Sequence, residues 1–123
     1  MSVTKAVSLG GAIVTGGCSG IGAACADVLA AEGRAVAVWD LDEQRSAAIA
    51  GQLAAQHGVS AIGIGIDLRR TDGIAAAVER TRTAVGAIGA LVHAAGVSNA
   101  IALSELTPDA WDTVLNVNLR ALP

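Results

Sequence analysis

Short apolar runs alternate with stretches of helical periodicity along most of the chain, and this alternation restricts the fold more than any other feature. The apolar runs predict strands at 12–15, 35–40, 59–66 and 91–93, and the periodic stretches predict helices at 19–32, 43–57, 72–85 and from 107 onward. Strands that are apolar throughout are typical of a parallel sheet covered on both faces. The sequence therefore predicts an α/β fold built on a doubly wound parallel sheet.

The segment between the first predicted strand and helix is rich in glycine, since residues 15–22 read TGGCSGIG. In such a segment Gly16 permits a tight turn, Gly20 lets a phosphate approach the backbone, and Gly22 lets the helix pack closely on the sheet. The N-terminus of the helix offers free N–H groups and a partial positive charge to a pyrophosphate. A plain turn is the alternative, and a Walker-type loop is excluded because no Lys-Ser/Thr pair follows. The flanking strand and helix favour a Rossmann-type dinucleotide site.

Asp40 ends the second predicted strand, 24 residues after Gly16. At this place in a Rossmann-type fold an acidic side chain binds the ribose hydroxyls of the adenosine and repels a 2′-phosphate. We therefore expect NAD to be preferred over NADP. The alternatives are a solvated acid at the end of a strand and a cap for the next helix, a role for which Asp42 competes.

A complete dinucleotide-binding fold has two βαβαβ halves in the strand order 3-2-1-4-5-6. The 123 residues supply the first half, the fourth strand and the start of the next helix. We therefore expect residues 1–123 to form a single domain, truncated after about four strands, that is the N-terminal part of a longer protein.

Five local patterns together resemble the short-chain dehydrogenase/reductase family over about residues 8–122. They are the TGxxxGIG spacing at 15–22, Asp67-Leu68 after the third strand, Ala95-Gly96 after the fourth, Trp111, and the run Val117-Asn118-Leu119. The resemblance implies a cofactor site that includes Gly16, Gly17, Cys18, Ser19, Gly20, Ile21, Gly22, Asp40, Leu41, Asp67, Leu68, Ala94, Ala95, Gly96 and Val117. It also implies that Asn118 belongs to the catalytic tetrad, near the nicotinamide, where it helps to hold a water linked to the catalytic Lys. The neutral Ser19 again favours NAD.

The sequence departs from the family pattern at the motif NNAG, which is replaced by His93-Ala94-Ala95-Gly96. We interpret His93 as a structural substitute that hydrogen-bonds between strands, rather than as a general base. Cys18 lies in the predicted phosphate loop, where a helix N-terminus can lower the pKa of a thiol. A redox role is the alternative, but a small residue tolerated in the loop is the preferred interpretation, and Cys25 is expected in the core.

The resemblance also implies a Ser, a Tyr and a Lys as the catalytic groups, and these are expected downstream of Asn118. The chain contains no Tyr, and Lys5 is its only lysine. General acid/base catalysis needs a group within hydrogen-bond reach of the transferred proton. We therefore predict the N-terminal, catalytically incomplete part of an NAD-dependent oxidoreductase. The alternatives are a non-catalytic dinucleotide-binding module and one half of an assembly that another chain completes; a flavodoxin-like binder is less favoured.

Composition restricts the partners. The chain is 53% hydrophobic and 15% charged with a net charge of -3, which excludes disorder and argues against nucleic acid and anionic membranes. Its apolar runs are shorter than a membrane span of roughly 18 residues. Met1 to Lys5 does not resemble a signal peptide, and two cysteines give neither a disulfide framework nor a metal site. We expect a cytoplasmic homo-oligomer that acts on a small-molecule alcohol or carbonyl compound.

Overall fold

A four-stranded parallel sheet in the order β3-β2-β1-β4 forms the centre of the computed structural model, which describes residues 9–122. The strands are β1 (Gly11–Thr15), β2 (Val36–Asp40), β3 (Ala61–Gly65) and β4 (Ile88–His93). This arrangement confirms the predicted doubly wound parallel sheet. The expectations for Lys5 and for the end of the chain at Pro123 concern residues outside the described range.

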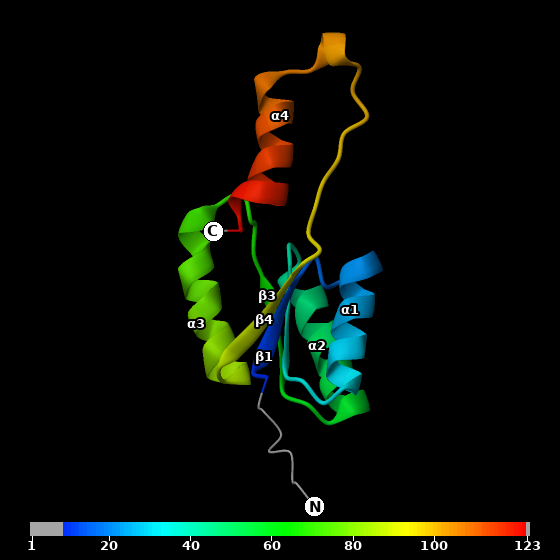
Figure 1. The fold of residues 1–123 in the computed structure, drawn as a ribbon, viewed down its shortest axis with the longest axis vertical. Coiled ribbons are helices and arrows are strands. Elements are labelled where there is room, and N and C mark those ends of the chain that lie inside the picture. The colour runs from blue at the N-terminus through cyan, green and yellow to red at the C-terminus, as the bar shows by residue number, and fades with distance from the viewer. Residues whose placement is uncertain (1–8, 123) are drawn as a thin grey trace, which may run out of the picture.

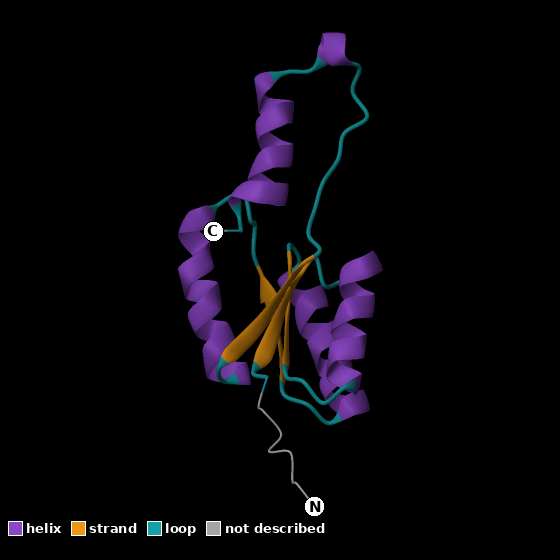
Figure 2. Ribbon diagram, in the orientation of Figure 1, coloured by secondary structure: helices purple, strands orange, loops and turns teal. Residues whose placement is uncertain are grey.

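Helices cover both faces of the sheet (Figure 1, Figure 2). On one face α1 (Gly20–Ala31) and α2 (Glu43–His57) bury Ala26, Ala30 and Leu53 against Val14, Val36 and Val38. On the other face α3 (Ile74–Val85) buries Ala77 against Ile13, Ala37, Trp39 and Ile64. Because β1 and β2 contribute side chains to both clusters, they are apolar up to their last residues, Thr15 and Asp40, in agreement with the sequence pattern.

Two helices begin at the capping residues that the sequence suggests. Asp42 caps α2 by accepting a hydrogen bond from the backbone N–H of Arg45, at 3.1 Å. Thr107 caps α4 (Pro108–Leu115) by accepting from the N–H of Ala110 at 3.2 Å, with Pro108 in the first turn. Asp42 therefore takes the capping role for which it competed with Asp40.

The glycines of β3 have a packing role. A Cβ on Gly63 would overlap the backbone of Ser46 and Ala47 in α2, and one on Gly65 would lie 2.6 Å from the Cβ of Glu43. These two positions, which weaken the strand pattern in the sequence, thus let α2 lie directly on β3. The cost in strand propensity is offset by closer packing.

The chain after β4 differs from its prediction. The expected single helix from Thr107 through Asn118 is α-helical only to Leu115, and the segment Asn116–Arg120 is a π-helical turn. Figure 1 shows α4 projecting beyond the carboxyl edge of the sheet and returning toward the N-terminal end of α3. Asn118 lies within this turn, and its side-chain amide binds the backbone of Val97 in the segment after β4.

Residues 9–122 contain no helix with the length and apolarity needed to cross a membrane. In the same residues, no three His, Cys, Asp or Glu side chains converge as a metal site would require.

The contact between α2 and β3 gives a stability prediction for the full-length gene product. Gly63→Ala should lower the free energy of unfolding by about 2 kcal/mol or more, because the methyl group must displace the α2 backbone. Gly51→Ala is the matched control, because Gly51 lies in α2 and has no atom within 4 Å of an added Cβ. This substitution should raise the free energy of unfolding by about 0.5–1 kcal/mol. Urea unfolding followed by circular dichroism measures both. Equal effects of the two substitutions would contradict the packing.

Candidate functional site: a pocket at the carboxyl ends of the strands

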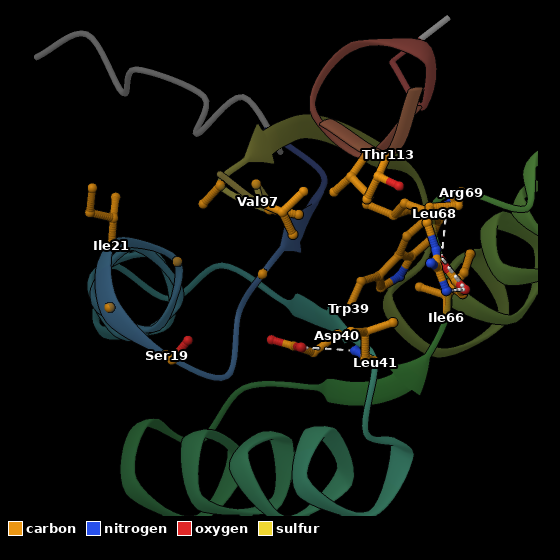
Figure 3. A pocket seen from close by; sticks show the side chains of 18 residues that line it. Ser19, Ile21, Trp39, Asp40, Leu41, Ile66, Leu68, Arg69, Val97 and Thr113 are labelled. Atoms are coloured by element: carbon orange, nitrogen blue, oxygen red, sulfur yellow. Dashed lines mark hydrogen bonds and ion pairs between the residues drawn. The ribbon is translucent and has the colours of Figure 1, made fainter. Parts of the chain in front are cut away.

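A cavity of about 640 Å³ opens at the carboxyl end of the sheet, between the N-terminus of α1 and the helix α4 (Figure 3). Its walls combine the glycine loop, the ends of β2 and β3, the segment after β4 and one side of α4. The lining residues are Gly16, Ser19, Gly20, Ile21, Gly22, Trp39, Asp40, Leu41, Ile66, Asp67, Leu68, Arg69, Ala94, Ala95, Gly96, Val97, Thr113 and Val117. Ligands of open α/β sheets bind in such a crevice, where the strand order reverses.

The pocket brings together all but three of the site residues predicted from the sequence. Gly17 and Cys18 belong to the glycine loop but face the sheet and α2 instead of the cavity. Asn118 lies next to Gly96 and does not line the cavity itself. Five lining residues were not predicted from the sequence: Trp39, Ile66, Arg69, Val97 and Thr113. Four of them are adjacent in sequence to predicted residues, and Thr113 lies one helical turn before Val117. Extending each motif by one residue would have found the four adjacent residues.

Three glycines give the loop its shape. Gly16 has a φ of 64°, and a Cβ there would lie 2.8 Å from the Cα of Ala95. A Cβ on Gly22 would overlap the carbonyl group of Gly16, so only glycine lets α1 begin this close to the loop. Gly20 has a φ of 55° and no atom within 4 Å of an added Cβ, which leaves the space over the helix N-terminus free. These contacts fit the roles of tight turn, open approach and close packing that a dinucleotide loop needs.

The N-terminus of α1 has no side-chain cap. Ser19 occupies the N-cap position but its side chain makes no capping hydrogen bond, and the first turn carries no acidic residue. The helices α2 and α4, by contrast, are capped by Asp42 and Thr107. The first turn of α1 therefore offers backbone N–H groups and the positive end of the helix dipole to the pocket, which suits an anionic group.

The Asp40 carboxylate is engaged by the backbone. One oxygen accepts from the N–H of Cys18 at 3.0 Å, and the other accepts from the N–H of Leu41 at 2.8 Å. Arg45 approaches the same loop residue from α2, because its guanidinium donates to the Cys18 carbonyl at 3.2 Å. Asp40 thus binds the N–H of Cys18 and Arg45 binds its carbonyl oxygen. The charge near this part of the glycine loop therefore depends on both side chains.

Cys18 packs inward and is only 6% exposed, with its Sγ 3.4 Å from the hydroxyl of Ser46. Burial raises the pKa of the Cys18 thiol, and the neighbouring Asp40 carboxylate raises it further. Ser46 and Arg45 act in the opposite direction without reversing this shift. Because a raised pKa reduces the thiolate, the geometry opposes a redox role and favours the interpretation of Cys18 as a small residue that fits the loop.

Asp67 forms a bidentate ion pair with Arg69 on the pocket wall. The guanidinium donates to both carboxylate oxygens, from Nη2 at 2.7 Å and from Nε at 3.0 and 3.2 Å. This contact lowers the pKa of Asp67 and raises that of Arg69. The Asp67 carboxylate is therefore occupied, and the neighbouring guanidinium adds a cationic plane to the wall.

His93 links β1 to the π-helical turn. Its Nδ1 lies 2.8 Å from the hydroxyl of Thr15, and its Nε2 lies 3.1 Å from the carbonyl oxygen of Asn118. The side-chain amide of Asn118 in turn pairs with the backbone of Val97, at 2.8 and 3.0 Å. The prediction that His93 hydrogen-bonds between strands is confirmed, whereas the catalytic role of Asn118 stays a prediction.

Known proteins of similar sequence define the family of this chain. A family model described as short chain dehydrogenase matches residues 11–122. A probable galactose dehydrogenase of Rhizobium meliloti is 38% identical over 112 residues, which are 91% of this chain and 44% of that protein. The chain belongs to the short-chain dehydrogenase family. It spans about half the length of the curated relatives that it matches.

Solved structures overturn one expectation. A short-chain dehydrogenase from Burkholderia cenocepacia in complex with NADP is 40% identical, with a TM-score of 0.84 over 93% of this chain and 46% of that one. L-sorbose reductase from Gluconobacter frateurii, complexed with NADPH and L-sorbose, is 28% identical with a TM-score of 0.84, over 94% of this chain and 45% of that one. The expected preference for NAD over NADP is therefore wrong. The inference from Asp40 failed because its carboxylate already accepts from the backbone N–H groups of Cys18 and Leu41, while the cationic Arg45 binds the carbonyl oxygen of Cys18.

The environment of Cys18 predicts slow alkylation. In the full-length gene product at about pH 7.5, iodoacetamide should modify Cys18 several-fold more slowly than Cys25, which is partly exposed. A raised pKa leaves less thiolate at this pH, and the rate should rise as the pH increases. Peptide mass spectrometry of time points measures both rates, and the same reaction in concentrated urea is the control in which the difference should vanish. Faster modification of Cys18 than of Cys25 in the folded protein would contradict this environment.

Proposed function

We propose that this chain is the cofactor-binding part of an NADP(H)-dependent oxidoreductase that interconverts an alcohol and a carbonyl compound. The observation that carries the proposal is the uncapped N-terminus of α1, which faces a pocket at the reversal point of the strand order. When bound, the nicotinamide supplies the hydride chemistry, and the protein supplies binding and orientation. The family membership and the fold of the NADP and NADPH complexes support this choice.

Different residues of the pocket would bind different parts of the dinucleotide. The backbone of the first turn of α1, at Ser19–Ile21, would hold the pyrophosphate, for which Gly20 leaves open space. The adenosine side would lie at the ends of β2 and β3, against Leu41 and Leu68. The nicotinamide side would then extend along Ala94–Gly96 toward Val117. The remaining predicted cofactor contacts are Gly16, Gly17, Cys18, Gly22, Asp40 and Asp67.

The groups that move the proton belong, in this proposal, to a part of the enzyme other than residues 1–123. The chain has no Tyr and a single Lys, and the ionisable side chains that line the described pocket are each paired: Asp40 with backbone N–H groups, and Asp67 with Arg69. A paired group is poorly placed to act as a general acid. The cytoplasmic location, the homo-oligomer and the alcohol or carbonyl substrate stay predictions.

The proposal predicts a cofactor preference that equilibrium binding can measure. The full-length gene product should bind NADPH at least about tenfold more tightly than NADH, because a 2′-phosphate gains from the cation of Arg45 beside the loop. Quenching of tryptophan fluorescence is a suitable signal, since Trp39 lines the pocket.

Two glycine variants control this experiment. Gly22→Ala should abolish binding of both dinucleotides, because the added methyl overlaps the Gly16 carbonyl and displaces α1. Gly51→Ala, which meets no atom within 4 Å, should bind both as the wild type does. Tighter binding of NADH than of NADPH would contradict the proposed cofactor, and binding of neither would contradict the proposed function.

A further inference from the structure

A chain of hydrogen bonds connects three segments of the pocket wall through His93. The backbone N–H of Ala95 donates to the Thr15 hydroxyl at 3.2 Å, and that hydroxyl lies 2.8 Å from the His93 Nδ1. The His93 Nε2 reaches the Asn118 carbonyl at 3.1 Å. Thr15 precedes Gly16, Ala95 lines the pocket, and Asn118 follows Val117, so one side chain joins the glycine loop, the segment after β4 and the π-helical turn.

The partners of His93 decide its tautomer. A carbonyl oxygen only accepts hydrogen bonds, so the contact with Asn118 requires the proton on Nε2. In the neutral ring Nδ1 is then an acceptor, and the Thr15 hydroxyl must donate to it while accepting from Ala95. Each polar group in this chain of bonds is used once in the direction that it requires. Thr15 is only 3% exposed, so water cannot readily replace a lost partner there.

Asn118 connects His93 to Val97, which lines the pocket. Its side-chain amide accepts from the N–H of Val97 at 2.8 Å and donates to the Val97 carbonyl at 3.0 Å. Gly96 lies against the same amide, since a Cβ on Gly96 would be 3.4 Å from the Asn118 Oδ1. The position of the wall at 96–97 thus depends on Asn118, and the position of Asn118 depends on His93.

We propose that His93 is a positioning residue for the nicotinamide half of the cofactor, acting through Thr15 and Asn118 without touching the ligand. This inference rests on the proposed dinucleotide site. The segments that His93 joins lie at the ends of β1 and β4, whereas the adenosine side lies across the loop at the ends of β2 and β3. Loss of His93 should therefore weaken binding of the whole dinucleotide and spare a ligand that fills only the adenosine half.

The test compares NADPH with adenosine 2′,5′-bisphosphate, which lacks the nicotinamide half, in the full-length gene product. His93→Ala should raise the Kd for NADPH by about tenfold and change the Kd for the bisphosphate less than about twofold. His93→Gln should restore NADPH binding to within about threefold of wild type, because an amide offers one donor and one acceptor as the Nε2–H tautomer does. His57→Gln is the matched control; His57 pairs with Asp27 between α1 and α2 and should affect neither ligand.

The outcomes separate this inference from the proposed function. Wild-type affinity for NADPH in His93→Ala, equal losses for both ligands, or no rescue by His93→Gln would each overturn the positioning role. Failure of the unsubstituted protein to bind either ligand would overturn the proposed function, and the positioning role with it. If His93→Ala does not fold, His93→Asn takes its place. Its shorter side chain keeps one of the two hydrogen bonds, and it should weaken NADPH binding about threefold while sparing the bisphosphate.

Discussion

The close approach of α1 to the glycine loop is the contact on which the pocket depends. The backbone of Gly22 lies against the carbonyl group of Gly16, where no side chain fits, and this contact points the first turn of α1 across the end of β1. The uncapped N–H groups of that turn then face the cavity rather than a protein acceptor. The proposed binding of a pyrophosphate would therefore depend on backbone N–H groups that the glycines leave accessible.

The polar side chains around the cavity mostly bind one another or the backbone. Asp40 fastens the glycine loop through Cys18, Asp67 pairs with Arg69, and His93 joins Thr15 to Asn118. Such mutual pairing positions the walls before a ligand arrives, which reduces the ordering cost of binding. In the proposed function, this pairing would leave these side chains to position the cofactor rather than to transfer a proton.

Local sequence patterns predicted most of the fold because each element carries its own signal. The apolar runs of β1 and β2 and the caps at Asp42 and Thr107 are readable from a few adjacent residues. The packing role of Gly63 could not be predicted from the sequence, because it depends on the close contact of Gly63 with the backbone of Ser46 in α2. The π-helical turn at Asn116–Arg120 was missed for the same reason, because the Asn118 amide is held by Val97 from a distant segment.

The candidate site shows the same division. The glycine loop was predicted residue by residue, because the spacing of the glycines alone indicates where the backbone turns tightly and where the helix packs closely. The cofactor preference was not, because the effect of Asp40 depends on what else its carboxylate binds and on Arg45 from another element. The charge of a side chain is visible in a sequence, whereas its partners appear only in the fold.

A crystal structure of the full-length gene product with NADPH would test the central claim most directly. The account predicts pyrophosphate oxygens within about 3 Å of the backbone N–H groups at the start of α1. It also predicts the adenosine beside Leu41 and Leu68 and the nicotinamide toward Val97 and Val117. A dinucleotide bound elsewhere, or with its two halves exchanged, would contradict the account.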